Sequence, residues 1–239
     1  MKKLIFLLPF LITLSSCDQA TLQRTLETVL NDSSALTDGQ IASGLKEALN
    51  QGIGKGVTVL SAKDGFFKSQ YKILLPPEAR KVTDKLKNVP GFSQVEDIIL
   101  EKINRGAEDA AAKAKPIFVN AIKSMTFNDA RNILFGADNS ATQYLNRATY
   151  TSLYGEFNPV IVNSMDKFQA RKYWSDAVNA YNKIPFVDKA NPDLDDYVTK
   201  EALSGLFSMV EKEEKNIRNN IQARTSDLLK RVFAAQDRR

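Results

Sequence analysis

The stretch LTDGQIASGLKEALNQGIGKGVTVL, residues 36–60, decides the fold class because it carries both the start and the apolar face of a long helix. Thr37 and Gln40 have the spacing of a capping box, which satisfies free N–H groups at a helix start. Leu36 and Ile41 stand at the positions of a hydrophobic staple. Apolar residues then recur at helical spacing: Ile41, Leu45, Leu49, Ile53, Val57 and Leu60.

Small residues occur every four positions along the same stretch: Gly44, Ala48, Gly52 and Gly56. Glycine lowers helix stability by about 1 kcal/mol relative to alanine. Three glycines at this spacing therefore indicate that a second helix packs very closely against the ridge of small residues. A ligand that lies in a groove along the ridge is the alternative interpretation.

The rest of the chain continues with helical patterns and turn signals. Ser93 with Glu96 and Thr126 with Asp129 have capping-box spacing, and Pro116 is expected to break a helix. Because no segment alternates with a period of two for long enough to build a sheet, the sequence predicts an all-α protein.

Further helices are predicted around residues 140–154, 159–168 and 170–183, the second opened by Pro159. Residues 61–77 are irregular, with a short run from Tyr71 to Leu75 that could be extended. These patterns predict a single domain of about eight to ten helices over residues 36–234, followed by a polar tail at 235–239.

The first 17 residues have the order of a secretory signal. Two lysines precede an apolar run, Leu4–Leu14, which is followed by Ser15, Ser16 and Cys17. The run has about half of the roughly 20 apolar residues that a membrane-spanning helix needs. We therefore expect residues 1–16 to be a signal peptide that is removed.

The segment Leu14-Ser15-Ser16-Cys17 resembles the bacterial lipobox, whose cysteine is acylated and becomes the new N-terminus. The resemblance implies that Cys17 carries the acyl chains that hold the protein on a membrane, with residues 17–35 as the tether. An ordinary signal peptide with an incidental cysteine is the alternative. We expect a lipid-anchored protein of the bacterial cell envelope, with the choice of inner or outer membrane open.

The composition excludes most catalytic chemistry. The 239-residue chain has no histidine, and its single cysteine is the one assigned to lipid. Nucleophile systems that need histidine, and nearly all zinc, copper or haem sites, are therefore excluded, and we expect no cofactor and no metal. Removal of Lys2 and Lys3 lowers the formal charge from +5 to +3, which is weak support for any polyanion, and no nucleic-acid partner is expected.

Two stretches, one rich in aromatic residues and one rich in acidic residues, allow either a structural or a binding role. Residues 144–186 are rich in aromatic side chains, which could line an amphiphilic pocket or fill the core of a helical bundle. Asp193, Asp195 and Asp196 begin a long helix, where acids complement the helix dipole. A cation site built from these oxygens is the alternative.

The long C-terminal helix has charged residues on or beside its apolar stripe. Glu214 lies near the centre of the stripe, Glu211 lies at its flank, and Arg218 follows Glu214 by one turn. A structural ion pair of Glu214 with Arg218 or Arg224 is the favoured interpretation. The alternative is that Glu214, with Glu211, transfers protons in glycan hydrolysis. The stripe consists of Leu203, Phe207, Val210, Ile217 and Ile221.

Several runs closely resemble one protein family, catalogued as domain of unknown function 4197. They are residues 36–49, Ala114–Phe118, Met125–Leu134 and the block from Pro192 to Phe233. The resemblance covers about residues 36–234 and implies a single, largely helical domain of a bacterial envelope protein. It implies no reaction, substrate or ligand. The chain departs from the family pattern near residues 219–221, where a proline is common, so we expect that helix to end differently.

Three functions remain open for the helical domain. The first is a non-enzymatic lipoprotein that binds an envelope partner, such as a protein, or that scaffolds an assembly. The second is a binder of a hydrophobic or amphiphilic small molecule, and the third is a carboxylate-dependent glycan hydrolase.

We predict that Cys17→Ala abolishes acylation, because no other thiol is present. The processed protein should then move from the membrane fraction to the soluble fraction of the envelope, as measured by fractionation and immunoblotting. Ser16→Ala, which keeps a small residue before the cysteine, is the control. A Cys17→Ala protein that still sediments with membranes after signal cleavage would contradict the lipid anchor.

Overall fold

The computed structural model describes residues 36–167, 169–191 and 193–237. The chain divides after Thr37, and the unit that starts at Asp38 contains every helix described here. The predicted signal peptide, the tether and Cys17 lie outside the described residues.

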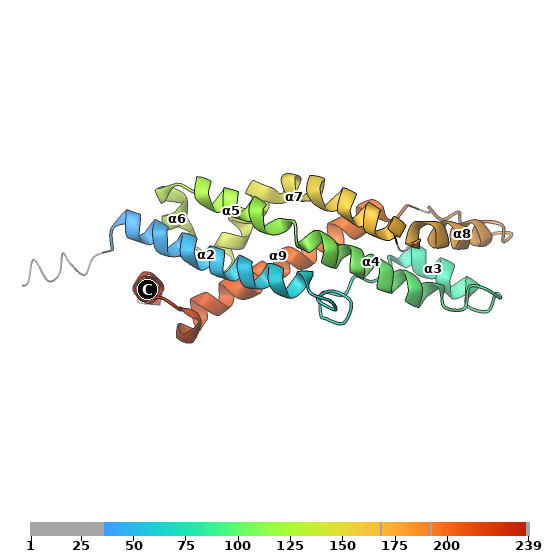
Figure 1. The fold of residues 1–239 in the computed structure, drawn as a ribbon, viewed down its shortest axis with the longest axis horizontal. Coiled ribbons are helices and arrows are strands. Elements are labelled where there is room, and N and C mark those ends of the chain that lie inside the picture. The colour runs from blue at the N-terminus through green and yellow to red at the C-terminus, as the bar shows by residue number, and fades with distance from the viewer. Residues whose placement is uncertain (1–35, 168, 192, 238–239) are drawn as a thin grey trace, which may run out of the picture. The chain divides into compact units, whose positions relative to one another are not determined.

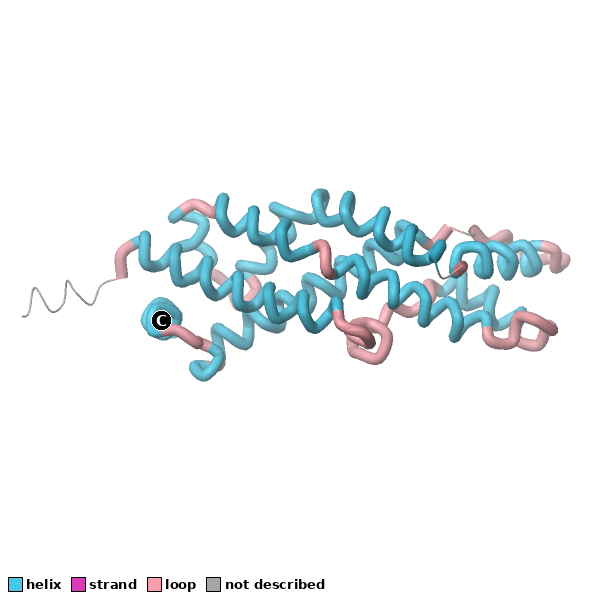
Figure 2. Tube along the Cα trace, in the orientation of Figure 1, coloured by secondary structure: helices cyan, strands magenta, loops and turns pink. Residues whose placement is uncertain are grey.

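The described residues form α-helices and one short 3-10 helix, with no strand, which confirms the all-α class (Figures 1 and 2). The helices are α2 (Asp38–Ser61), α3 (Pro77–Leu86), α4 (Val95–Ala111), α5 (Ala114–Ser124), α6 (Phe127–Leu134), α7 (Ser140–Lys167), α8 (Ala170–Asn182), α9 (Asp195–Asn219), η1 (Ile221–Ala223) and α10 (Asp227–Asp237). In the described part of the chain, no helix is both long enough and apolar enough to cross a membrane.

The four longest helices, α2, α4, α7 and α9, pack against one another and form the core of the bundle. Helices α3 and α8 continue it beside α4, whereas α5, α6 and α10 surround the part where α2 begins (Figure 1). Large apolar side chains fill the interior, among them Phe118, Phe157 and Trp174. These two aromatic positions from the 144–186 stretch, Phe157 and Trp174, are therefore core residues.

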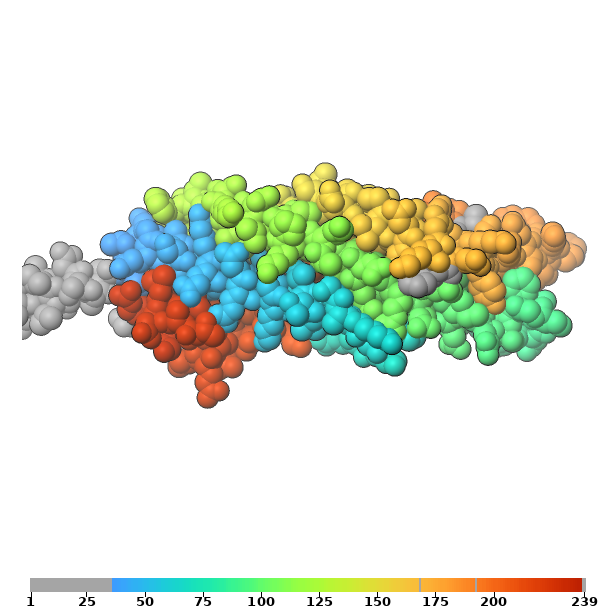
Figure 3. All heavy atoms as spheres, viewed as in Figure 1, coloured from blue at the N-terminus to red at the C-terminus, as the bar shows by residue number. Residues whose placement is uncertain are grey.

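The ridge of small residues on α2 is the surface where α9 and α10 approach most closely. A Cβ atom at Gly44 would lie 2.6 Å from Val232 of α10, and one at Gly56 would lie 3.2 Å from Met209 of α9. Figure 3 shows α10 directly against the first half of α2. Side chains of neighbouring helices thus occupy the ridge, which is the arrangement that the glycine spacing predicts.

Helix α7 differs from its prediction because it runs unbroken through Pro159 for 28 residues. The separate helices expected at 140–154 and 159–168 are one helix. A proline inside a helix costs about 3 kcal/mol, and the burial of Leu153, Phe157 and Ile161 on both sides of it offsets that cost. Pro159 itself is exposed, so its ring does not disturb the core.

The capping boxes predicted for α4 and α6 have different outcomes. Thr126 and Asp129 form the predicted box at the start of α6. Ser93 and Glu96 do not, because α4 begins two residues after Ser93 and Glu96 instead accepts a hydrogen bond from the Thr83 hydroxyl at 3.1 Å. At the other end of the chain, α10 extends to Asp237, so residues 235–237 of the expected tail are helical.

The connection between α2 and α3 is held by polar side chains of α4. The Asn104 side chain accepts a hydrogen bond from Ile73 N at 2.8 Å and donates one to Ile73 O at 2.9 Å. Glu108 accepts one from Phe66 N at 3.2 Å and pairs with Arg105 at 2.8 Å. The Asn104 side chain thus satisfies both backbone polar groups of Ile73, and the run at residues 71–75 is not part of a strand.

We predict that Gly44→Ala lowers the free energy of unfolding by about 1–2 kcal/mol. The new methyl group would overlap the stiff Val232 side chain, and this overpacking outweighs the gain in helix propensity. Gly54 is the matched control, because it lies in the same helix and has nothing within 4 Å of its would-be Cβ. Gly54→Ala should stabilise by about 0.5–1 kcal/mol. Urea denaturation followed by circular dichroism measures both, and equal effects would contradict close packing at the ridge.

Candidate functional site

A buried ion pair lies near the C-terminal end of α9. Glu214 and Arg218 are one helical turn apart, and the carboxylate Oε1 lies 2.9 Å from Nη2 of the guanidinium group. Both side chains are at least nine-tenths buried. The structure therefore brings together the first two residues of the predicted ion pair.

Glu214 also caps the start of α7. Its Oε1 accepts a hydrogen bond from Ala141 N at 2.9 Å, and its Oε2 accepts two from Thr142, N at 2.8 Å and Oγ1 at 2.7 Å. The first amides of a helix have no partner inside the helix, and they carry partial positive charge. A carboxylate from α9 supplies both the acceptors and the complementary charge.

Arg218 satisfies the end of α6 in the corresponding way. Its guanidinium group donates to Leu134 O at 3.0 Å and to Ile133 O at 2.7 Å, and these are the last carbonyl groups of that helix. It also donates to Gln236 Oε1 of α10 at 3.0 Å. One arginine thus joins α6, α9 and α10. We call Glu214 and Arg218, with the groups that they bind, the buried node.

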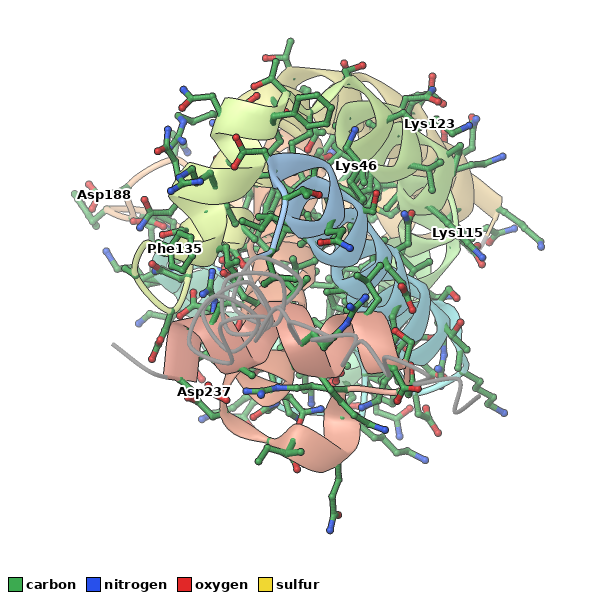
Figure 4. All side chains as sticks on the ribbon, turned by 90° about the vertical axis from the view of Figure 1, so that its left-hand side faces the viewer. Lys46, Lys115, Lys123, Phe135, Asp188 and Asp237 are labelled. Carbon is green, nitrogen blue, oxygen red and sulfur yellow. The ribbon has the colours of Figure 1, made fainter. Side chains whose placement is uncertain are left out.

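Arg224 is buried but does not contact Glu214, so the structure does not support it as a partner in that pair. It donates to Ile217 O and Arg218 O at the end of α9, at 3.1 and 2.7 Å. It also forms two hydrogen bonds with Asp237, at 2.6 and 3.0 Å. Figure 4 shows α10 lying across the part of the bundle where α2 begins, with Asp237 at one end of the helix.

Glu211 belongs to a different environment from Glu214. It is partly exposed and pairs with Lys215 at 2.5 Å. The hydrogen bond from Lys215 to Glu211 raises the pKa of the lysine above its ordinary value. The two carboxylates considered for proton transfer are thus engaged in separate interactions and do not face each other across a cleft.

The expected apolar stripe of α9 ends at Ile217, because Ile221 lies in η1 and is exposed.

A large open groove lies between α7 and α9, beside the buried node. Its volume is about 580 Å³. Thr142 belongs both to the groove wall and to the node, because its hydroxyl donates to Glu214. The α7/α9 groove is lined by Asn139, Thr142, Gln143, Asn146, Arg147, Tyr150, Lys200, Ser204, Phe207, Ser208 and Glu211.

The floor of the groove is aromatic. The rings of Tyr150 and Phe207 are stacked, with centroids 6.5 Å apart and planes 14° apart. Phe207 is buried and also contacts Phe118 edge-on at 5.8 Å. The partly exposed Tyr150 ring therefore rests on a fixed apolar base.

Ion pairs border the groove at the end near the start of α9. Lys200 lies 2.8 Å from Asp196, which also accepts a hydrogen bond from the Tyr154 hydroxyl at 2.8 Å. That hydrogen bond raises the pKa of Tyr154, and the hydrogen bonds from Lys200 and Tyr154 lower the pKa of Asp196. Asp195 pairs with Arg171 at 3.3 Å. Two of the three acids considered for a cation site are thus engaged in ion pairs, and the third, Asp193, accepts a hydrogen bond from Asp195 N at 2.9 Å. No cluster among the described residues has the groups to hold a metal ion.

A second, much smaller space lies next to the node. It measures about 20 Å³ and is lined mainly by apolar side chains of α2 and α9, with Ala48, Gly52 and Glu214 among its walls. A space of that size holds about one water molecule.

No sequence pattern predicted the α7/α9 groove, because its two walls come from helices about 60 residues apart in the chain. No pattern predicted that Glu108 and Glu213 are buried. Glu213 lies on the ridge side of α9, where it pairs with Lys55 of α2 at 2.9 Å. Helical periodicity placed Glu214 on the buried face, but the partners that satisfy such an acid become visible only in the fold.

We predict that Glu214→Gln lowers the free energy of unfolding by about 2–4 kcal/mol. The amide replaces one acceptor oxygen by an NH2 group, which faces N–H or O–H donors whichever way it turns. Glu211→Gln, three residues away on the same helix, removes only an exposed ion pair and should cost less than about 1 kcal/mol. Urea denaturation compares the two variants, and equal losses would show that the node is not the stabilising element.

Comparison with known proteins identifies a family but no characterised relative. No curated protein and no solved structure matches the chain. Residues 35–234 match the family described as "Protein of unknown function (DUF4197)". That range includes every element from α2 to η1 and most of α10. The match agrees with the resemblance of the sequence, and the chain belongs to this family.

Proposed function

We propose that the protein is a lipid-anchored component of the bacterial cell envelope, whose helical domain binds another envelope component without catalysing a reaction. The anchor would be the acylated Cys17, which follows the apolar run and two small residues at the expected cleavage point. The binding surface would be the α7/α9 groove.

One observation carries the non-enzymatic part of this proposal: five donor contacts engage the two oxygens of Glu214. A catalytic carboxylate needs an oxygen that is free to exchange a proton with the substrate. Glu214 was the acid that the sequence placed best for such a role. Its oxygens instead hold the start of α7 and the guanidinium group of Arg218.

The space inside the bundle argues against a buried hydrophobic ligand. Sites for small molecules have volumes of about 300–1,000 Å³, whereas the space beside Ala48 and Gly52 measures about 20 Å³. Side chains of α9 and α10 fill the rest of the ridge. A small molecule that binds inside the bundle, along the ridge, would therefore have to displace a helix.

The groove has the properties of a preformed binding surface. Its volume lies within the range of ligand sites. Its aromatic floor is supported by Phe118, and its wall is fixed to the node through Thr142. Binding to such a rigid surface requires little ordering of the protein, which leaves more of the interaction energy for affinity.

We predict that a photo-crosslinking amino acid at position 143, an exposed position of the groove, captures a discrete adduct in growing cells. The same amino acid at Lys115, which is exposed on α5 (Figure 4), should not. Gel mobility of the tagged protein after irradiation measures both. Adducts of equal yield from both positions would contradict a binding role for the groove.

A hydrolysis assay tests the proposal that the protein does not catalyse a reaction. Purified cell-wall glycan incubated with the wild-type protein should release no more reducing ends than with Glu214→Gln. Release that occurs with the wild type and stops in a folded Glu214→Gln variant would show that the protein is a hydrolase.

A further inference from the structure

The walls of the α7/α9 groove carry hydrogen-bonding groups in regular rows. Asn139, just before α7, is followed by Gln143 and Asn146 on the helix, and Ser204 and Ser208 lie one turn apart on α9. Carboxamides donate and accept on the same side chain, and hydroxyl groups do the same with one atom. Such rows suit a ligand that also presents both donors and acceptors at close intervals, as the hydroxyl groups of a sugar do.

Tyr150 gives the groove a flat apolar surface. It is partly exposed and stacked on Phe207, which the core holds from below. A tyrosine offers a ring face for C–H groups and a hydroxyl group for a polar partner. A pyranose ring matches this combination, because one of its faces is lined with C–H groups and its rim with hydroxyl groups.

Arg147 adds a positive charge to one wall of the groove. Arg147 is exposed and forms no hydrogen bond or ion pair with any residue in the described part of the chain. Lys200, on the opposite wall, is the second cation and is already paired with Asp196. A planar guanidinium group binds a carboxylate through two parallel hydrogen bonds, so Arg147 is placed to receive an acid group of the ligand.

Charge at the other end of the groove limits how acidic the ligand is. Glu211 lines that end and accepts from Lys215, and Glu214 lies buried behind it. A strand with a negative charge on every unit, such as a nucleic acid, would place some of those charges beside Glu211. A strand with widely spaced carboxylates avoids this repulsion.

The groove differs from peptide-binding sites in its lining. Proteins commonly recognise peptides at a sheet edge, in an apolar groove that takes a helix face, or between aromatic walls that take prolines. The α7/α9 groove has no strand at its walls among the described residues, and amide, hydroxyl and charged groups surround its single pair of rings. A peptide is therefore a less favoured ligand of the groove than a glycan.

We infer that the α7/α9 groove binds a segment of an acidic glycan, with Tyr150 against a sugar ring and Arg147 on a carboxylate. This inference rests on the proposed binding function and names the class of ligand. The walls extend from Asn139 to Tyr150 and from Lys200 to Glu211. At 1.5 Å per residue each wall is about 16 Å long, which accommodates a short oligosaccharide.

Isothermal titration calorimetry tests the inference with the full-length protein in lipid nanodiscs. The probe is a hyaluronan tetrasaccharide, which alternates uronic acids with N-acetylated amino sugars. A chitin tetrasaccharide is the neutral control, and an oligoglutamate peptide is the acidic control without sugar. The hyaluronan tetrasaccharide should bind, and the other two should bind at least about tenfold more weakly. The chitin tetrasaccharide lacks a carboxylate for Arg147, and the peptide lacks a sugar ring for Tyr150.

Variants locate the binding. Arg147→Ala should lower the affinity for the tetrasaccharide about tenfold. Arg231 is an exposed arginine of α10, away from the groove lining, and Arg231→Ala should leave the affinity unchanged. Tyr150→Phe keeps the ring and should retain most of the affinity, whereas Tyr150→Leu should lose most of it. Circular dichroism checks that each variant is folded. Oligosaccharides released from the cell wall and from lipopolysaccharide then compete with the probe, and the stronger competitor identifies the source of the glycan.

Three results would overturn the inference. They are tetrasaccharide affinity that Arg147→Ala does not change, preference for the peptide or the neutral sugar, and no binding of any probe. If crosslinking from position 143 persists in these cases, the groove still binds an envelope component and only the glycan assignment fails. If the crosslink is also absent, the proposed function fails with it.

Discussion

Two helix ends inside the protein need partners, and the buried node provides them. The first amides of α7 and the last carbonyl groups of α6 point into the bundle, where water cannot satisfy them. A buried polar group without a partner costs about 1–3 kcal/mol. The Glu214–Arg218 pair meets both needs at once, because its acid faces the helix start and its base faces the helix end. The turn between α6 and α7 is therefore fixed relative to α9.

The position of the groove follows from this arrangement. Thr142 donates to Glu214 from the same turn of α7 that lines the groove. Further along, the stacking of Tyr150 on Phe207 and the hydrogen bond from Tyr154 to Asp196 keep α7 and α9 aligned in opposite directions. The surface proposed to bind a ligand thus lies between two helices that are joined at both ends by polar contacts and in the middle by rings. Specificity at such a surface depends on the side chains of its walls more than on movement of its backbone.

Local sequence patterns predicted the elements of this fold better than their connections. The spacing of Gly44, Gly52 and Gly56 correctly indicated close helix packing, because a ridge of small residues affects only the adjacent helix. The prediction that a separate helix begins at Pro159 was wrong, since burial of its neighbours in a long helix outweighs the preference of proline for the first turn of a helix. For the site, helical periodicity placed Glu214 and Arg218 on one face. Their further partners Thr142 and Ile133 lie more than 70 residues away, beyond the reach of any local pattern.

The C-terminal helix affects when the bundle can be completed during synthesis. Arg218 and Arg224 are buried, and each has a partner among the last few described residues, Gln236 and Asp237. A ribosome makes α10 after the rest of the bundle, so the two guanidinium groups lack these partners until α10 has been made. The ridge of α2 is likewise not covered at Gly44 until α10, which carries Val232, has been made. For a chain that, as proposed, crosses the inner membrane before folding, this late closure favours an export-competent state over premature collapse in the cytoplasm.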